Sequence, residues 1–211
     1  MHLELERALL DVLLLWILTA PHEFAHAWVA TRLGDDTPRR EGRVTLYPLA
    51  HVDWLGTAIL PFVTSLLSGG FIGWGKPVRT DVAKLKGGLN GLALVAMAGP
   101  FSNVIMAVIL GAAAVFSAHA APALAGFAAE GVRLSLYLAI LNLLPVPPLD
   151  GNSAVMVLMS EGVAHRYLDW VQHSRNFALL GLIIAWSLFD RIFQPVFFFA
   201  LHTLYAGVHN G

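Results

Sequence analysis

Long apolar runs alternate with short polar segments along this chain. The runs cover residues 8–33, 89–118 and 132–144, and two more follow at 177–189 and 192–208. Since an α-helix rises 1.5 Å per residue, about 20 apolar residues are enough to cross the hydrocarbon core of a bilayer. The pattern therefore predicts an all-α polytopic membrane protein, a bundle of about four to six transmembrane helices.

A shorter apolar run, residues 55–67, does not fit a simple crossing. It contains Pro61 and leads into the glycine-rich run from Gly69 to Gly75, and proline and glycine both interrupt regular helix. Irregular backbone survives at membrane depth only where it is buried in protein or lines a water-filled cavity. We therefore expect a re-entrant or hairpin element at about 55–75, next to an aqueous site.

Basic residues indicate which ends of the apolar runs face the cytoplasm, because Arg and Lys gather in cytoplasmic loops. The segments 32–54 and 73–88 are both basic, whereas residues 119–131 contain neither Lys nor Arg. We expect the two basic segments on the cytoplasmic side of the membrane, and we expect residues 119–131 to form a loop outside it.

Composition supports the membrane assignment and excludes several functions. Hydrophobic residues make up 57% of the 211 residues and charged residues only 13%, against about 25% charged in soluble domains. A formal net charge of −1 gives no reason to expect a nucleic-acid partner. The absence of cysteine excludes disulfides, thiolate zinc ligands and a cysteine nucleophile.

The N-terminal run resembles a secretory signal in length but not in charge. Glu4, Glu6 and Asp11 stand where a signal peptide carries basic residues. We expect a retained membrane helix, in which Asp11 fits either the outer interface or the lining of a cavity.

The sharpest chemical signal is the stretch from His22 to His26, which reads His-Glu-Phe-Ala-His. Residues at positions i and i+4 share one face of a helix, so both imidazoles can reach one metal ion while Glu23 stands beside it. The histidines supply neutral nitrogen ligands, and the glutamate can act as a base toward water. The alternative is a pair of interfacial histidines with a charged neighbour, but ionisable residues inside a membrane helix usually mark a functional site.

Two histidines leave a catalytic metal one ligand short, since such sites usually take three protein ligands and keep one position open. Asp150 follows the fourth apolar run after three prolines and precedes Gly151. A helix that runs from outside to inside would bring Asp150 to the same half of the membrane as His22. Alone, an Asp-Gly pair after prolines indicates a turn; beside the histidine motif, a ligand is the favoured interpretation.

These segments resemble the site-2 protease family of intramembrane zinc metalloproteases. The matching stretches spread over residues 20–152 in the family's order, and the first and the last are the most specific: 22–27, 46–53, 73–78, 98–103 and 142–151. The compact group without PDZ or nucleotide-sensing domains fits best. The resemblance implies a single intramembrane metalloprotease domain over residues 1–211, with a catalytic core at about 8–155 and C-terminal apolar helices at about 177–208.

The resemblance also implies roles for individual residues and a place in the cell. It implies zinc ligands at His22, His26 and Asp150, a base at Glu23, and substrate-binding positions at Asn142, Gly73 and Gly75. One zinc ion per chain is expected, and the substrate is a transmembrane protein or peptide within the lipid bilayer. The expected setting is regulated intramembrane proteolysis in the cell membrane of a prokaryote, with the active site toward the cytoplasm.

Some residues keep two interpretations. Gly99, Pro100 and Asn103 fit helix packing as well as a site role, because small residues let membrane helices approach closely. His51 and Asp53 fit a loop cap better than a site role.

Two other functions compete with proteolysis. A proton or metal-ion transporter would spread ionisable residues over several spans, but the run at 89–118 has none. A catalytically silent membrane scaffold would not need Glu23, because a structural zinc requires no base.

Overall fold

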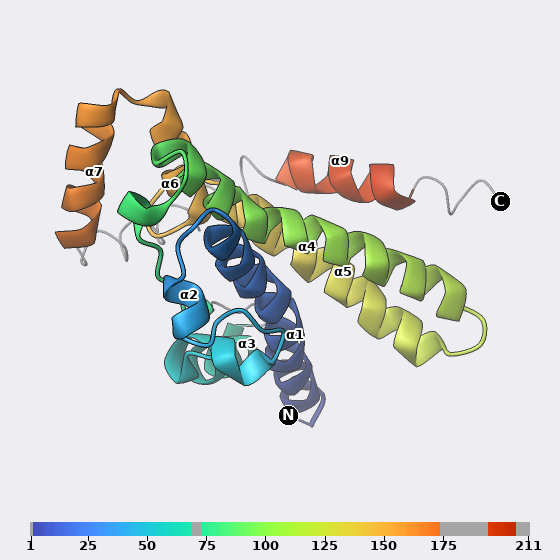
Figure 1. The fold of residues 1–211 in the computed structure, drawn as a ribbon. Helices are drawn as coiled ribbons and strands as arrows, with labels where there is room; N and C mark the ends of the chain where they lie inside the picture. The colour runs from blue at the N-terminus through green and yellow to red at the C-terminus, as the bar shows by residue number, and fades with distance from the viewer. Residues whose placement is uncertain (1, 69–72, 174–193, 206–211) are drawn as a thin grey trace.

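The computed structural model describes residues 2–68, 73–173 and 194–205, and every regular element in these ranges is helical (Figure 1). The all-α prediction is confirmed. The three longest helices are α1 (His2–Arg32), α4 (Leu89–Ser117) and α5 (Pro122–Asn142). Each of them is long and apolar enough to cross a membrane, so the chain is a membrane protein with several spans.

Shorter elements connect the long helices. They are α2 (Thr37–Arg40), the turns η1 (Pro48–His51), η2 (Trp54–Ile59), η3 (Val82–Lys84) and η4 (Met156–Leu158), and the helices α3 (Leu60–Ser68), α6 (Asp150–Val155), α7 (Glu161–His173) and α9 (Gln194–Tyr205). The expected run at 177–189 lies outside the described residues. At 12 residues, α9 alone is shorter than a membrane crossing needs.

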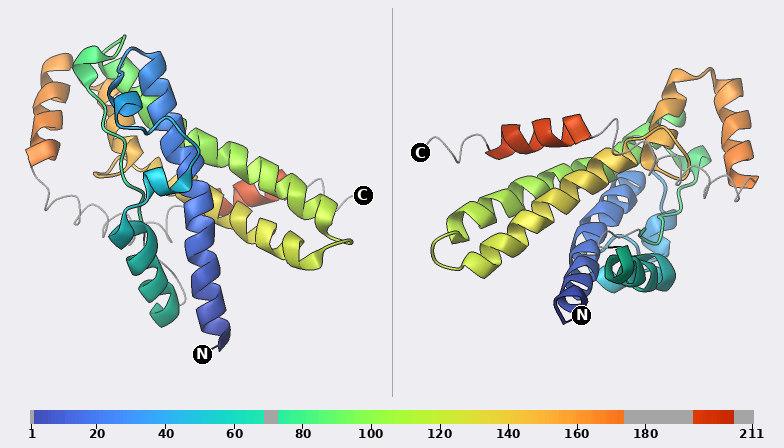
Figure 2. Two further views of the ribbon diagram at one scale, coloured as in Figure 1. Left: turned by 60° about the horizontal axis from the view of Figure 1, so that its bottom comes forward. Right: turned by 180° about the vertical axis from the view of Figure 1, so that it is seen from behind.

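Helices α4 and α5 form a long antiparallel hairpin, and α1 packs across it near the end where α4 begins (Figures 1 and 2). The predicted runs at 8–33 and 89–118 match α1 and α4 closely. The prediction that residues 119–131 form a loop is wrong for most of that segment, because α5 begins at Pro122. Proline suits the first turn of a helix, and the alanines and leucine that follow favour helix.

The element expected at 55–75 consists of two parts in the described residues. η2 and α3 form a short apolar helical segment that packs beside α1. From Gly73 the chain runs back without regular secondary structure along η1 and η2. There the Trp74 N–H donates to the Gly56 carbonyl at 2.9 Å and the Lys76 N–H donates to the His51 carbonyl at 2.9 Å.

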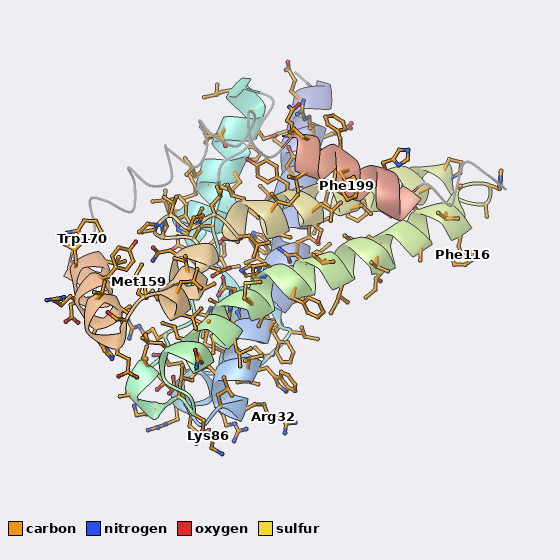
Figure 3. The ribbon with its side chains drawn as sticks, turned by 90° about the horizontal axis from the view of Figure 1, so that it is seen from above. Arg32, Lys86, Phe116, Met159, Trp170 and Phe199 are labelled. Atoms are coloured by element: carbon orange, nitrogen blue, oxygen red, sulfur yellow. The ribbon has the colours of Figure 1, made fainter. Side chains whose placement is uncertain are left out.

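The two basic segments lie together, as the sequence predicts. The Lys86 N–H donates to the Leu33 carbonyl at 2.8 Å, and Figure 3 shows Lys86 close to Arg32 and far from Phe116 at the other end of α4. Buried Asp35 adds a second link: its carboxylate accepts the backbone N–H groups of Thr37 at 3.0 Å and Asp81 at 2.7 Å. The end of α1 is therefore fastened to the segment that leads into α4.

Two buried contacts hold α1 in the bundle. Leu14 and Leu18 of α1 pack against Leu134 of α5 in one apolar cluster. Nearer the N-terminus, the Ser65 hydroxyl of α3 donates a hydrogen bond to the carboxylate of Asp11, which is buried. Asp11 therefore ties α1 to α3, and this contact satisfies a polar group that would be costly in an apolar interior without a partner.

Candidate metal centre

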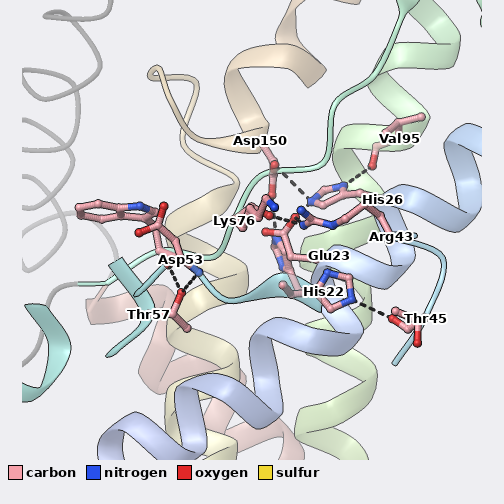
Figure 4. A network of polar contacts seen from close by, with 12 residues as sticks. His22, Glu23, His26, Arg43, Thr45, Asp53, Thr57, Lys76, Val95 and Asp150 are labelled. Carbon is pink, nitrogen blue, oxygen red and sulfur yellow. Dashed lines mark hydrogen bonds and ion pairs between the residues drawn. The ribbon is translucent and has the colours of Figure 1, made fainter. Parts of the chain in front are cut away.

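Helix α1 brings the two histidines of the motif onto one face. His22 and His26 are one helical turn apart, and both side chains are buried. Their Nε2 atoms lie 3.1 Å from each other (Figure 4). This is the arrangement that the i, i+4 spacing predicts.

Asp150 reaches the histidines from a distant part of the chain. It is the first residue of α6, and its Oδ2 lies 3.2 Å from His22 Nε2 while its Oδ1 lies 3.4 Å from His26 Nε2. The approach depends on Gly151, where a Cβ would lie 2.2 Å from the Leu143 carbonyl oxygen. Only a glycine lets the start of α6 pack this closely on the end of α5.

The spacing of the donor atoms of these three residues fits a zinc ion. Zinc binds imidazole nitrogen and carboxylate oxygen at about 2.0–2.2 Å, which gives a tetrahedron with edges of about 3.3–3.5 Å. The two Nε2 atoms lie 3.1 Å apart, and each has one Asp150 oxygen at a similar distance: Oδ2 at 3.2 Å from His22 and Oδ1 at 3.4 Å from His26. One donor atom from each residue can be chosen so that all three lie within 4.8 Å of one another. In the described part of the chain, these residues form the one group of three histidine or acidic side chains whose donor atoms could hold a metal ion.

The hydrogen bonding of His26 also favours a metal ligand. Its Nδ1 lies 2.7 Å from the Val95 carbonyl oxygen, and a carbonyl can only accept, so the hydrogen-bond network assigns the proton to Nδ1. The Nε2 lone pair is then free to face the metal position, and an outer hydrogen bond of this kind is typical of metal-bound histidines.

Glu23 stands beside the centre without being one of the three donors. Its side chain is buried, and its Oε2 lies 3.7 Å from the Nη2 of Arg43 without a hydrogen-bond partner. A buried carboxylate with an unused oxygen can accept a proton from a water molecule at the centre. Its position therefore suits the predicted role of a base.

Arg43 is a site residue that the sequence interpretation counted only as a basic loop residue. Arg43 is 2% exposed, and its guanidinium contacts Glu23 and donates to the Lys76 carbonyl. Burial lowers the pKa of Arg43, and the nearby carboxylates of Glu23 and Glu41 oppose this shift. Only the tertiary structure shows this cation beside the centre, because its spacing in the sequence carries no signal.

Gly99 of α4 allows a helix to pass directly over the donor atoms. A Cβ at Gly99 would lie 2.3 Å from His26 Nε2 and 2.6 Å from His22 Nε2. Gly99 therefore serves both helix packing and the site, because α1 and α4 pack closely at the two histidine nitrogens themselves.

A cavity of about 400 Å³ adjoins the donor atoms. Its lining includes all the predicted site residues together with Asn103 and apolar side chains from α1, α4 and α5. Asn142 lies at the end of α5, and its Nδ2 donates to the Leu138 carbonyl at 3.0 Å, so its Oδ1 remains available as an acceptor.

The segment that begins at Gly73 offers the cavity an edge of backbone. Trp74 and Lys76 use their N–H and carbonyl groups toward η1, η2, Thr57 and Arg43. For Gly73 and Gly75, no backbone hydrogen bond to another described residue is present. A Cβ at Gly75 would lie 2.9 Å from Glu23 Oε1, so this backbone runs directly past the predicted base.

His51 and Asp53 have local structural contacts. His51 Nε2 bonds to the Thr45 carbonyl at 2.8 Å, and burial lowers the pKa of its imidazole. The Asp53 carboxylate caps η2 by accepting the Gly56 N–H at 2.9 Å. Both agree with the predicted capping role.

Fold and site together define a class: a multi-span membrane protein with a His-His-Asp group that could hold a metal ion and a buried glutamate beside it. Comparison with known proteins gives the family. The chain is 33% identical, over 200 aligned residues, to YwhC of Bacillus subtilis, which is named as a candidate zinc metalloprotease; the match takes in 83% of this chain and 88% of YwhC. The chain belongs to the site-2 protease family of zinc metalloproteases.

Relatives named Rip2, also named as candidate zinc metalloproteases, match a smaller part. The Rip2 of Mycolicibacterium smegmatis is 35% identical over 147 residues, which is 66% of this chain and 54% of that protein. The Rip2 of Mycobacterium tuberculosis is 35% identical over 140 residues. No family model and no solved structure matches the chain.

Proposed function

We propose that this protein is an intramembrane zinc metalloendopeptidase that hydrolyses peptide bonds in or near the transmembrane segments of membrane proteins. The observation that carries the proposal is the meeting of His22, His26 and Asp150 at separations of 3.1–3.4 Å, with Glu23 beside them, among helices that can cross a membrane. Membership of a family of zinc metalloproteases supports it.

The donor set accounts for one zinc ion per chain. When bound, zinc supplies Lewis acidity, which lowers the pKa of water and polarises a carbonyl group. His22, His26 and Asp150 hold the ion, and the Val95 carbonyl keeps the His26 ring in the orientation that presents Nε2.

Glu23 performs the proton transfers. Its carboxylate takes a proton from the attacking water and passes it to the amine that leaves when the peptide bond breaks. Arg43 holds the carboxylate in place, with its Nη2 3.7 Å from Glu23 Oε2. A scaffold would have no use for this arrangement, which is why catalysis is preferred over a purely structural centre.

The backbone at Gly73 and Gly75 and the Asn142 side chain account for substrate binding. A transmembrane helix hides its peptide bonds in its own hydrogen bonds, so it must unwind before attack. An exposed backbone edge can replace the lost bonds by strand addition, and the Asn142 amide can hold a further peptide group.

The orientation proposed for the site follows from the basic segments. These segments meet at the end of α1 that follows His26, and Arg and Lys favour the cytoplasmic side. We place the protein in the cell membrane of a prokaryote with the centre toward the cytoplasm, where regulated intramembrane proteolysis releases its products.

The test begins with zinc per chain in the purified, detergent-solubilised protein. About one zinc in the wild type, retained by Glu23→Gln and lost from Asp150→Ala, is the expected result. Cleavage of single-span substrates should then occur with the wild type and stop with Glu23→Gln and after chelation. Wild-type protein without tightly bound metal would contradict the proposal and favour transport or a scaffold, and so would metal binding with transport and no cleavage.

A further inference from the structure

Asn103 is a buried amide with no partner. It lies in α4 with 0% of its surface exposed, and neither its side-chain oxygen nor its nitrogen has a hydrogen-bond partner. Such a group loses its hydrogen bonds to water on burial and gains none in return, which destabilises the folded state. Buried polar atoms are almost always paired, so an unpaired amide in a membrane protein needs a reason.

The position of Asn103 supplies that reason. Asn103 lines the same cavity as the metal donor atoms and Asn142. It lies one turn along α4 from Gly99, the residue that packs on the two histidine nitrogens. Four residues of helix advance about 6 Å, which equals roughly two residues of an extended peptide.

The backbone of Asn103 is itself held firmly. The Ser135 hydroxyl of α5 donates to the Asn103 carbonyl at 2.7 Å, and Ser135 is also fully buried. This bond fixes the turn of α4 from which the amide projects. The side chain is thus positioned by the fold while its own donor and acceptor remain unused.

We propose that Asn103 binds a main-chain peptide group of the substrate about two residues from the bond that is cut. This inference rests on the proposed proteolysis and deepens it. A carboxamide offers N–H donors and a carbonyl acceptor, which match the carbonyl and the N–H of a peptide group whatever the substrate's side chains. Asn142 already donates to its own helix, so Asn103 is the residue with both functions free.

The variant Asn103→Leu separates binding from packing. Leucine keeps the branching at Cγ but has no polar atoms, and replacing an unsatisfied polar group by an apolar one is neutral or stabilising. We expect unchanged zinc content, an unchanged or higher Tm, and a rise in KM that lowers kcat/KM about tenfold or more. Asn152→Leu is the control for stability: buried Asn152 accepts a hydrogen bond from Tyr167, so this variant should lower Tm.

Cross-linking tests the contact directly, because the chain contains no cysteine. Asn103→Cys is combined with Glu23→Gln and allowed to form disulfides with a series of single-cysteine substrates. Cross-links should concentrate within about two residues of the cut bond. The control is Ala107→Cys, one turn further along α4, where Ala107 packs against Val132 and Leu136.

The outcomes separate this inference from the proposed function. A wild-type KM in Asn103→Leu, or cross-linking no stronger than that of Ala107→Cys, overturns the role of Asn103 even if the enzyme cleaves its substrates. If the wild type cleaves nothing, proteolysis fails, while cross-linking still reports whether Asn103 meets a bound transmembrane segment.

Discussion

At the scale of single residues, the centre depends on neighbours with no chemistry of their own. Gly99 gives α4 room above the histidine nitrogens, and Gly151 lets Asp150 start a helix against the end of α5. Arg43 sits between Glu23 and the Lys76 carbonyl. The site is therefore as sensitive to small changes of volume as to the loss of a ligand.

Gly99→Ala should lower zinc content strongly without unfolding the protein. Its new Cβ would come within 2.3 Å of a ligand nitrogen, so either α4 or both imidazoles must move. Zinc per chain and Tm are the measurements. Gly126→Ala is the matched control, because a Cβ there meets nothing within 4 Å; equal zinc loss in both variants would contradict this explanation.

Arg43→Met should reduce kcat/KM by about tenfold or more while zinc stays bound, because the Glu23 carboxylate and the Lys76 carbonyl both lose a charged partner. Arg43→Lys should recover part of the activity, since it restores the charge but not the fork of donors. Kinetics and metal content are measured on the same preparations. If Arg43→Met keeps wild-type kinetics, the contact is only structural.

At the scale of elements, the segment from Gly73 onward forms the backbone edge that lines the cavity beside the candidate metal centre. This edge is where we expect the substrate to bind. The backbone groups of Trp74 and Lys76 are hydrogen-bonded to η1, η2 and neighbouring side chains, while Gly73 and Gly75 line the cavity. Trp74 also covers Gly56, where a Cβ would lie 2.3 Å from the ring. This packing holds an irregular strand in place without a sheet.

Gly75→Ala should lower cleavage by about tenfold with zinc retained, because its Cβ would lie 2.4 Å from Thr19 Cγ2 and 2.9 Å from Glu23 Oε1 and would push the edge away. Adding Thr19→Ser removes the Cγ2 atom and should restore part of the activity. Initial rates of the two single variants and the double variant decide the point. Simple addition of the two effects would argue against a steric cause.

At the scale of the whole molecule, three long helices form the bundle in the described part of the chain, and a small set of polar links joins the segments between them. Asp35 is the central link at the end of α1. Burial alone would raise the pKa of Asp35, but hydrogen bonds from Thr37 and from the Asp81 amide outweigh it and hold the pKa below its ordinary value. The ionised carboxylate therefore stabilises the folded state.

The contribution of Asp35 should depend on pH. Because its pKa is lower in the folded state, its stabilisation is complete above the ordinary value of about 4 and is lost as pH falls through the folded pKa. Asp35→Asn should destabilise the protein by about 1–3 kcal/mol near pH 7. Thermal unfolding in detergent should show a Tm difference that narrows below about pH 4; a constant difference would assign the effect to packing.

The local pattern of the sequence is enough to predict a membrane protein and the two histidine ligands of the site. A stretch of about twenty predominantly apolar residues predicts a span, because bilayer thickness and helix rise vary little. The sequence therefore predicts the extents of α1 and α4 closely. The spacing of His22 and His26 places two imidazoles on one face for the same local reason. The sequence does not predict the start of α5, because the few charged residues in 119–131 are compatible with a loop as well as with a helix.

The sequence by itself determined an all-α membrane protein, the paired histidines and the candidate third ligand Asp150, which the family resemblance also implies. The tertiary structure decided which distant groups meet them: Asp150 at 3.2 and 3.4 Å, Arg43 beside Glu23, Gly99 over the nitrogens and the unpaired amide of Asn103. The physical reason is that helix periodicity orders only near neighbours, whereas the facing of one helix toward another depends on packing across the whole bundle.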